Sequence, residues 1–144
     1  MENKSFTTSI EVAQSPKELF SHIMEVQKWW TKDFEGSNTK LGDEFVIHHP
    51  NAHYSKQKVV EVIPDKKIVW LVTESTLYWL KGDKHEWTST KMIFEISTEE
   101  NKTILHFMHE GLVHEKECYD MCSNGWSKVI KDHLFNFITI GKTI

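Results

Sequence analysis

The alternation of apolar and polar positions divides the chain into an opening strand, two short helices, a group of strands and a closing helix. Apolar residues alternate with polar ones in segment 6–12, which is the period of a strand with one buried face. Segment 15–18, with the sequence SPKE, is a helix start signal: a serine N-cap, a proline in the first turn and a glutamate that completes a capping box. Apolar residues in segments 19–23 and 26–30 predict a short helix followed by a second short helix or turn.

The middle of the chain has the two-residue period of β-strands, and turn residues such as those of segments 64–65, 82–83 and 99–102 separate its parts. Segment 75–80 either extends the strand before it or forms a short strand of its own. The predicted strands span residues 44–48, 58–63, 67–73, 87–97 and 103–110.

A helical period returns at the end of the chain. Apolar residues recur at steps of three or four over a helix from about Glu115 to Gly141, which is roughly 40 Å long at 1.5 Å per residue. The residues of its predicted inner face are Tyr119, Cys122, Trp126, Val129, Ile130, His133, Phe137 and Ile140.

This order of elements predicts an α+β fold. We expect a curved antiparallel sheet of six or seven strands, two short helices after the first strand, and a long C-terminal helix packed over the concave face of the sheet. A helix is about 10 Å wide and each strand adds about 4.8 Å, so one helix cannot fill the whole concave face. Large side chains or a cavity must fill the rest, and the chain has six Trp and eight Phe for this purpose. The pattern therefore predicts a pocket without showing whether it is open.

Composition is that of an ordinary globular protein, with 39% hydrophobic and 26% charged residues. The chain has 144 residues, no linker and no repeat, so we expect a single domain over residues 1–144. Lys+Arg is 17 and Asp+Glu is 21, and this acidic balance argues against nucleic acid as a partner. No apolar run of about 18 residues and no leader pattern is present, which predicts a cytoplasmic protein without a membrane span.

Five motifs in a fixed order carry a resemblance to a known superfamily; they are residues 10–20, 41–45, 59–70, 103–112 and 124–134. With them the chain resembles the SRPBCC superfamily, also called START-like or birch-pollen-allergen-like. Within it, the chain is most similar to the branch of the C-terminal domain of the activator of heat-shock-protein-90 ATPase. The resemblance implies the helix-grip fold. It implies less about function, because the superfamily includes lipid carriers, hormone receptors, polyketide cyclases, oxygenase domains and co-chaperones.

One position departs from the pattern of this superfamily. Its central strand often has a glycine two residues before the valine that corresponds to Val59, and this chain has Gln57 there. We expect either that the strand bends less or that a polar side chain enters the pocket.

Nine histidines and two cysteines raise the question of a metal site. Three clusters are candidates: His48 with His49 and His53, His106 with His109 and Glu110, and His114 with Cys118 and Cys122. Neighbouring histidines on a strand point to opposite faces, so we expect the first cluster at a solvated rim or turn. The second cluster lies on a predicted strand, whereas a zinc protease motif needs a helix. The third cluster shares one face of the predicted helix, where we expect core packing. We therefore predict no metal and no cofactor.

The residues predicted to contact a ligand lie on the inner faces of the sheet and of the closing helix, or where the short helices and a loop meet the cavity. They are Trp30, Phe45, Trp70, Trp79, Met92, Phe107, His109, Tyr119, Cys122 and Trp126. Their aromatic character is typical of a pocket for a small apolar molecule and also of a protein interface.

We therefore expect a monomer or homodimer that binds a hydrophobic small molecule, lipid-like or aromatic, between the helix and the sheet, without catalytic residues. The resemblance implies an alternative, a co-chaperone-like domain of the stress response that binds and stimulates a heat-shock-protein ATPase. A third alternative is a polyketide cyclase-like or hydrolase-like enzyme with His109 or Tyr119 as proton donor. No Ser-His-Asp order, carboxylate pair or phosphate-binding glycine loop supports catalysis.

Overall fold

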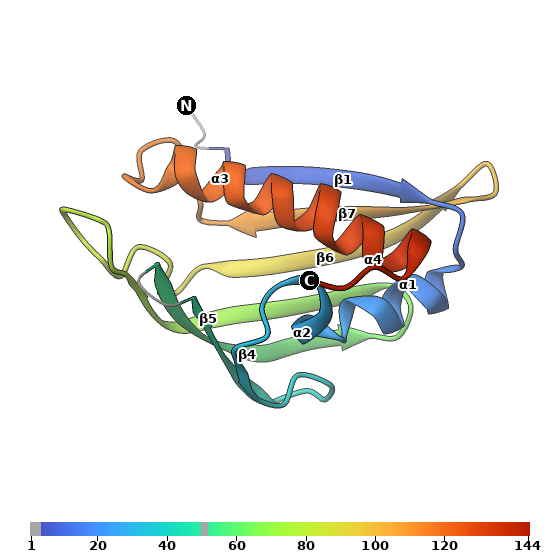
Figure 1. Cartoon of the computed structure of the whole chain (residues 1–144), viewed down its shortest axis with the longest axis horizontal. Helices are drawn as coiled ribbons and strands as arrows, with labels where there is room; N and C mark the ends of the chain where they lie inside the picture. The colour runs from blue at the N-terminus through green and yellow to red at the C-terminus, as the bar shows by residue number, and fades with distance from the viewer. Residues whose placement is uncertain (1–3, 50–51) are drawn as a thin grey trace.

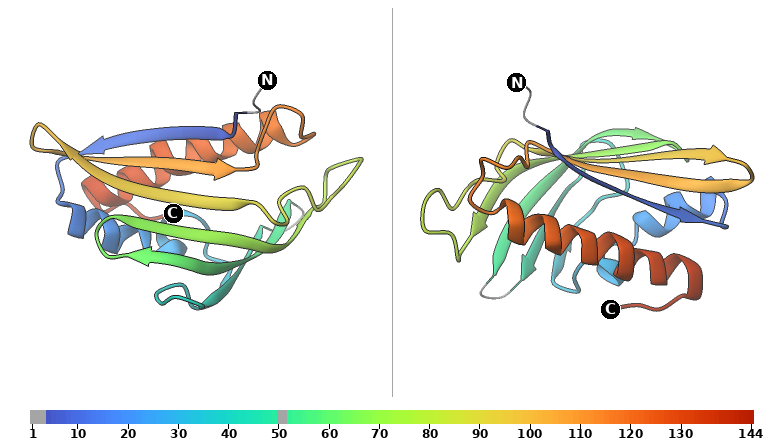
Figure 2. Two further views of the ribbon diagram at one scale, coloured as in Figure 1. Left: turned by 180° about the vertical axis from the view of Figure 1, so that it is seen from behind. Right: turned by 90° about the horizontal axis from the view of Figure 1, so that it is seen from above.

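A curved sheet of seven antiparallel strands lies against one long helix in the computed structural model, which describes residues 4–49 and 52–144 (Figure 1). Seen from above, the sheet and the helix form two layers, with the two short helices beside the C-terminal half of the long helix (Figure 2). The predicted α+β helix-grip architecture is confirmed. No helix in the described residues is long and apolar enough to cross a membrane.

The strand order is β1-β7-β6-β5-β4-β3-β2, so the first strand pairs with the last and the remaining neighbours follow the chain. The elements are β1 Phe6–Val12, α1 Pro16–Ile23, α2 Val26–Trp29, β2 Phe34–Gly36, β3 Glu44–His49, β4 His53–Ile63, β5 Lys67–Leu77, β6 Lys91–Glu99 and β7 Lys102–Glu110. The long helix consists of α3 Tyr119–Lys128, the π-helical segment η1 Val129–Leu134, and α4 Phe135–Ile140.

The predicted start of the first helix is confirmed in detail. The Glu18 N–H donates to Ser15 Oγ over 3.1 Å, and the Ser15 N–H donates to Glu18 Oε1 over 3.1 Å. Pro16 occupies the first turn. This capping box fixes the direction in which α1 leaves β1, and α1 then buries Leu19 and Ile23 against the core.

Three strands differ from the prediction. β4 begins at His53, whereas the prediction placed its start at residue 58. The prediction missed the first residues because polar side chains at inward positions break the expected alternation of apolar and polar positions. β6 begins at Lys91 instead of Trp87, since residues 87–89 form a turn in which Ser89 has a φ of 74°. β2 was not predicted, because three residues are too few to show a period.

The long helix begins at Tyr119, four residues later than predicted. The Glu86 carboxylate, from the loop before β6, accepts hydrogen bonds of 3.0 Å from the N–H groups of Glu117 and Cys118. This distant side chain satisfies N–H groups that a helix start leaves free, and it fixes where the helix begins. Consequently His114 lies in a turn instead of on the helix, with its ring centroid 4.1 Å from that of Tyr119.

The π-helical segment η1 shifts the buried face of the helix. A π-turn contains one residue more than an α-turn, so positions beyond it rotate relative to the predicted stripe. Leu134 and Ile138 are buried although the predicted stripe omits them. Ile140, which the stripe includes, is 70% exposed.

Aromatic side chains fill most of the space between the helix and the sheet. Trp70 lies at the centre of this core, stacked on Trp30 at a ring distance of 6.2 Å and in edge contact with Phe94 at 4.8 Å. Phe107 contacts Trp126 of the helix at 4.5 Å. The question that the sequence left open is thus largely answered: bulky rings occupy most of the predicted cavity, and a smaller pocket remains at one end.

Candidate functional site

The remaining pocket lies at the end of the sheet beneath α3, has a volume of about 260 Å³, and is mostly apolar. It is formed where β3, β4 and β5 meet the loop after β5 and the first half of the long helix. Its lining residues are Trp30, His49, His53, Leu77, Trp79, Trp87, Met121, Cys122, Gly125, Trp126, Lys128 and Val129.

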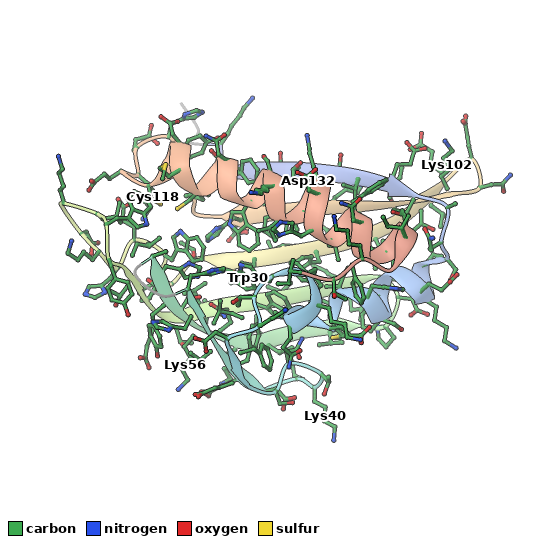
Figure 3. The ribbon with its side chains drawn as sticks, in the orientation of Figure 1. Trp30, Lys40, Lys56, Lys102, Cys118 and Asp132 are labelled. Carbon is green, nitrogen blue, oxygen red and sulfur yellow. The ribbon has the colours of Figure 1, made fainter. Side chains whose placement is uncertain are left out.

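Three tryptophans form the inner wall of the pocket. Trp87 stacks on Trp126 at a ring distance of 5.9 Å with an interplanar angle of 14°, and Trp30 contacts Trp126 at 5.0 Å. Trp30 lies between the helix and the sheet (Figure 3). Trp79 and Met121, which are 38% and 66% exposed, form the rim. Rigid aromatic walls of this kind suit a flat apolar ligand.

Gly125 keeps the helical side of the pocket open. A Cβ atom built at this position would meet no atom within 4 Å outside its own helix and its chain neighbours. A glycine inside a helix costs about 1 kcal/mol relative to alanine, and no close backbone contact at Gly125 requires it. Its effect on the site is to leave space beside Trp126.

The pocket has no acidic lining residue within the part of the chain that the structure describes, although the chain has 21 acidic residues and a net charge of −4. Its titratable side chains other than Cys122 are His49, His53 and Lys128. Burial, and secondarily the neighbouring histidines, lowers the pKa of His53 to about 3, so its ring is neutral at pH 7. Burial also lowers the pKa of His49. The site thus favours neutral or anionic groups over cations.

Polar residues on the inner face of β4 begin at the pocket and continue into the core; we call His53, Ser55 and Gln57 the β4 polar row. Ser55 and Gln57 are fully buried. Among the described residues, His53 Nε2, Ser55 Oγ and both amide atoms of Gln57 have no hydrogen-bond partner. Burying a polar group without a partner costs about 1–3 kcal/mol. The β4 polar row is therefore expected to lower the stability of the fold.

Gln57 shows what its departure from the superfamily pattern does. Its side chain enters the interior, as one of the two expectations proposed, but it lies deeper than the pocket lining. The other expectation, a strand that bends less, is not needed to accommodate it. The pairing of β4 with β5 shifts its register between Lys56 and Gln57 and again between Val59 and Glu61, and such bulges bend a strand.

Replacing Gln57 by leucine is expected to raise the free energy of unfolding by about 1–3 kcal/mol, because it removes two buried atoms that lack partners while keeping the volume. Urea denaturation measures the difference. Gln27→Leu, at an exposed position of α2, is the control and should change stability by less than about 0.5 kcal/mol. A loss of stability in Gln57→Leu would contradict the prediction and indicate that buried water satisfies the amide.

His109 lies behind the pocket wall and holds it in place. The Trp126 Nε1–H donates to His109 Nδ1 over 3.0 Å, so the imidazole proton is on Nε2 and is donated to Thr90 Oγ1 over 2.8 Å. The Thr90 hydroxyl donates to the Trp87 carbonyl. Because both ring nitrogens are occupied and burial lowers the pKa of His109 to about 3, the side chain positions two wall tryptophans and does not reach the ligand space.

A glycine lets this hydrogen-bond chain close. Gly111 has a φ of 103°, and a Cβ atom there would lie 2.7 Å from Thr90 Cγ2. Only a residue without a side chain allows β7 to end so close to Thr90.

The predicted ligand-contact residues fall into two groups. Trp30, Trp79, Cys122 and Trp126 line the pocket. The other six do not: His109 lies behind the wall, Tyr119 packs against His114 with the two rings tilted by 33°, and four are fully buried in the core. Those four are Phe45, Trp70, Met92 and Phe107.

Several lining residues were not predicted as ligand contacts. His49 and His53 were expected at a solvated rim or turn, but both are on strands and line the pocket. Trp87 was predicted as the first residue of a strand, but it forms part of the pocket wall. The sequence signal that could have found His53 is its two-residue spacing from Ser55 and Gln57, which continues the inward face of β4.

The three groups of histidines and cysteines that were weighed as metal sites do not come together among the described residues. Over residues 4–49 and 52–144, no three His, Cys, Asp or Glu side chains come together as metal ligands would. Cys118 and Cys122 are buried, and hydrogen bonding between the two thiols and burial raise the pKa of the Cys118 thiol.

Comparison with known proteins supports the fold. The family model described as Activator of Hsp90 ATPase homolog 1-like protein matches residues 18–138. A search of curated proteins gives no significant match. The solution structure of the Aha1 dimer from Colwellia psychrerythraea is 22% identical, with a TM-score of 0.78, and the alignment covers 96% of this chain and 98% of that one.

Two further solved structures have the same fold at lower identity. CalU16 from Micromonospora echinospora is 15% identical with a TM-score of 0.67, over 96% of this chain and 78% of that one. DynU16, a protein in the dynemicin biosynthetic locus, is 11% identical with a TM-score of 0.72, over 99% of this chain and 49% of that one. At these identities the likeness extends to the fold alone.

Proposed function

The chain belongs to the family of Activator of Hsp90 ATPase homolog 1-like proteins, and from this premise we propose that it binds a hydrophobic small molecule between its C-terminal helix and its sheet, without catalysing a reaction. The observation that carries the proposal is the pocket of about 260 Å³ with its wall of three tryptophans. This volume of about 260 Å³ lies just below the usual range for ligand pockets, which is about 300–1,000 Å³. It suits a compact aromatic molecule of about two fused rings better than a long acyl chain.

Binding is best tested with naphthalene-type probes, because their flat rings match the pocket walls. We expect 2-naphthol to bind to the intact chain and to raise its melting temperature, measured by isothermal titration calorimetry and thermal unfolding. If no compound in a panel of one- to three-ring aromatics binds, the proposed function is wrong.

Filling the pocket from the helix should abolish binding without disturbing the fold. In Gly125→Phe the new ring would occupy the space beside Trp126, and we expect affinity for 2-naphthol to fall at least tenfold. Gly125→Ala is the matched control: its Cβ meets no atom within 4 Å, so binding should persist while stability rises by about 0.5–1 kcal/mol. Equal affinity in Gly125→Phe and Gly125→Ala would place the binding site elsewhere.

A co-chaperone-like role is the second candidate, and the family match and the likeness to the Aha1 dimer favour it. In this role the chain would bind a heat-shock-protein ATPase and stimulate its ATP hydrolysis, as a monomer or homodimer. An ATPase assay with purified Hsp90 and light scattering of the chain alone test it. If the chain neither stimulates ATP hydrolysis by Hsp90 nor co-elutes with it, this candidate is removed.

The cyclase-like or hydrolase-like alternative has less support in the pocket. The two proton donors considered for it, His109 and Tyr119, do not line the space. Both nitrogens of His109 are used within the protein. An enzyme at this site would have to rely on other titratable lining residues for proton transfer, which are His49, His53, Cys122 and Lys128.

A further inference from the structure

The loop between β5 and β6 and the start of the long helix are joined by two carboxylates that reach across in opposite directions. Glu86 of the loop accepts hydrogen bonds of 3.0 Å from the N–H groups of Glu117 and Cys118. Glu117 in turn accepts from the N–H groups of Lys81 and Gly82 in the loop, over 3.1 and 2.9 Å. Each carboxylate oxygen receives one N–H group. We call Glu86 and Glu117 the carboxylate clasp.

The contacts of the carboxylate clasp are of a strong kind. A hydrogen bond from an N–H group to an ionised carboxylate is about twice as strong as one between neutral groups. Hydrogen bonds from the backbone of Gly82 and of Lys81 lower the pKa of the Glu117 carboxyl, so it is ionised at pH 7. Lys116 Nζ adds a bond of 3.3 Å to the Glu86 carbonyl. A Cβ atom at Gly82 would lie 3.3 Å from Glu117 Oε1, so the loop backbone comes close to this carboxylate.

The carboxylate clasp connects the two sides of the pocket mouth. Trp79, on the rim, stands two residues before Lys81, and Met121, on the other side of the rim, stands three residues after Cys118. The loop and the start of the helix lie at the same end of the molecule (Figures 1 and 2). Lys81 and Gly82 are exposed, and Glu117 is the one described residue that accepts from their N–H groups. The separation of Trp79 from Met121 therefore depends on these bonds.

From this geometry we propose that Glu86 and Glu117 are positioning residues that set the width of the pocket mouth, and with it the size of the ring system that the pocket accepts. The inference rests on the proposed function and adds a determinant of ligand size to it. Without the clasp, the loop loses its anchor on the helix and Trp79 moves away from Met121. A two-ring ligand then loses contacts at the rim, whereas a three-ring ligand gains space.

The test compares two flat alcohols of different size, 2-naphthol and 9-phenanthrol. Isothermal titration calorimetry gives the ratio of their dissociation constants for the unmodified chain, Glu117→Ala, Glu117→Gln and Glu115→Ala. The ratio cancels a loss of overall stability, because both probes bind to the same folded protein. We expect the preference for 2-naphthol to fall about fivefold or more in Glu117→Ala, which loses two charge-assisted hydrogen bonds.

Two of these variants are controls for the chemistry and the place of the substitution. Glu117→Gln keeps one accepting oxygen, so its preference should lie between those of the unmodified chain and Glu117→Ala. Glu115→Ala removes an exposed carboxylate from the turn before the helix, two residues away from Glu117, and should leave the ratio unchanged.

Amide hydrogen exchange without ligand tests the clasp itself. The N–H groups of Lys81 and Gly82 should exchange about fivefold faster or more in Glu117→Ala than in Glu115→Ala, because they lose their acceptor and the loop opens locally. The N–H groups of β6 and β7 should exchange at the same rate in both variants, which shows that the fold is intact.

The outcomes separate the two proposals. If 2-naphthol binds but the ratio is the same in Glu117→Ala and Glu115→Ala, the clasp does not set the ring size and this inference is overturned, while the proposed function stands. Unchanged exchange of the Lys81 and Gly82 N–H groups in Glu117→Ala also overturns it. If no aromatic probe binds to the unmodified chain, the proposed function fails and this inference fails with it.

Discussion

Lowering the pH from 7 to 5 is expected to reduce the free energy of unfolding by about 4 kcal/mol, roughly 2 kcal/mol for each of two buried histidines. Burial lowers the pKa of His53 and of His109 from 6.5 to about 3. Nearby histidines add to the effect at His53, and Lys116 adds to it at His109.

The free energy of unfolding falls with pH because the unfolded chain binds more protons than the folded chain. Above pH 6.5 both rings are neutral in the folded and the unfolded chain, so the histidines do not affect stability. As the pH falls below 6.5, the unfolded chain binds two protons that the folded chain excludes, and stability falls until the pH approaches 3. Marginally stable proteins have only about 5–15 kcal/mol to lose, so we expect acid unfolding near pH 4.

Urea denaturation at a series of pH values between 7.5 and 5 measures this slope. In that window Asp43, whose pKa is lowered by hydrogen bonds from Ser37 and from the backbone, remains ionised. His53→Gln should remove about half of the slope, and His106→Gln, at an exposed position of β7, should leave it unchanged. A stability that does not change over this range would show that both rings bind protons in the folded protein.

The second large effect is expected at Trp126. Replacing it by alanine should lower the free energy of unfolding by about 3–5 kcal/mol, because it removes the ring that packs against Phe107, Trp30 and Trp87 and leaves a cavity. It also leaves His109 Nδ1 without its donor. Urea denaturation at pH 7.5 provides the measurement.

Two further variants divide this effect into its parts. Trp126→Phe keeps an aromatic ring but loses the hydrogen bond to His109, so we expect an intermediate loss of about 1–3 kcal/mol. Trp79→Ala removes a tryptophan from the rim, where 38% of the residue is exposed, and should cost less than about 1 kcal/mol. If Trp126→Ala and Trp79→Ala lose the same stability, Trp126 does not anchor the helix to the sheet.

Local signals in the sequence predicted most of the fold. The capping box at Ser15 and Glu18 and the alternation in β1, β5 and β7 depend on neighbours within a few residues, and these predictions are confirmed. The start of the long helix depends on Glu86, about thirty residues earlier in the chain. No local pattern contains that contact, so the helix was predicted four residues too long at its start.

The site was harder to predict because its distinctive residues break the pattern used to find strands. An inward-facing polar residue looks like a loop residue when only hydropathy is considered. His53, Ser55 and Gln57 are such residues, and for this reason β4 was predicted to begin five residues too late. The aromatic residues were recognised correctly as a group, but a sequence cannot show which rings fill the core and which face the remaining space.

The π-helical segment has a consequence for how this helix tolerates sequence change. One residue corresponds to about 100° of rotation around a helix axis. The extra residue in η1 therefore changes which sequence positions face inward in the half of the helix that follows it. The half before Val129 faces the pocket, and the half after Leu134 faces α1, where Phe137 contacts His22 at 4.7 Å. Deleting one residue within η1 is therefore expected to convert it to regular α-helix and to keep both halves facing as they do now, the first toward the pocket and the second toward α1. Alignments of this helix with relatives therefore need a one-residue gap wherever the relative has a regular α-helix.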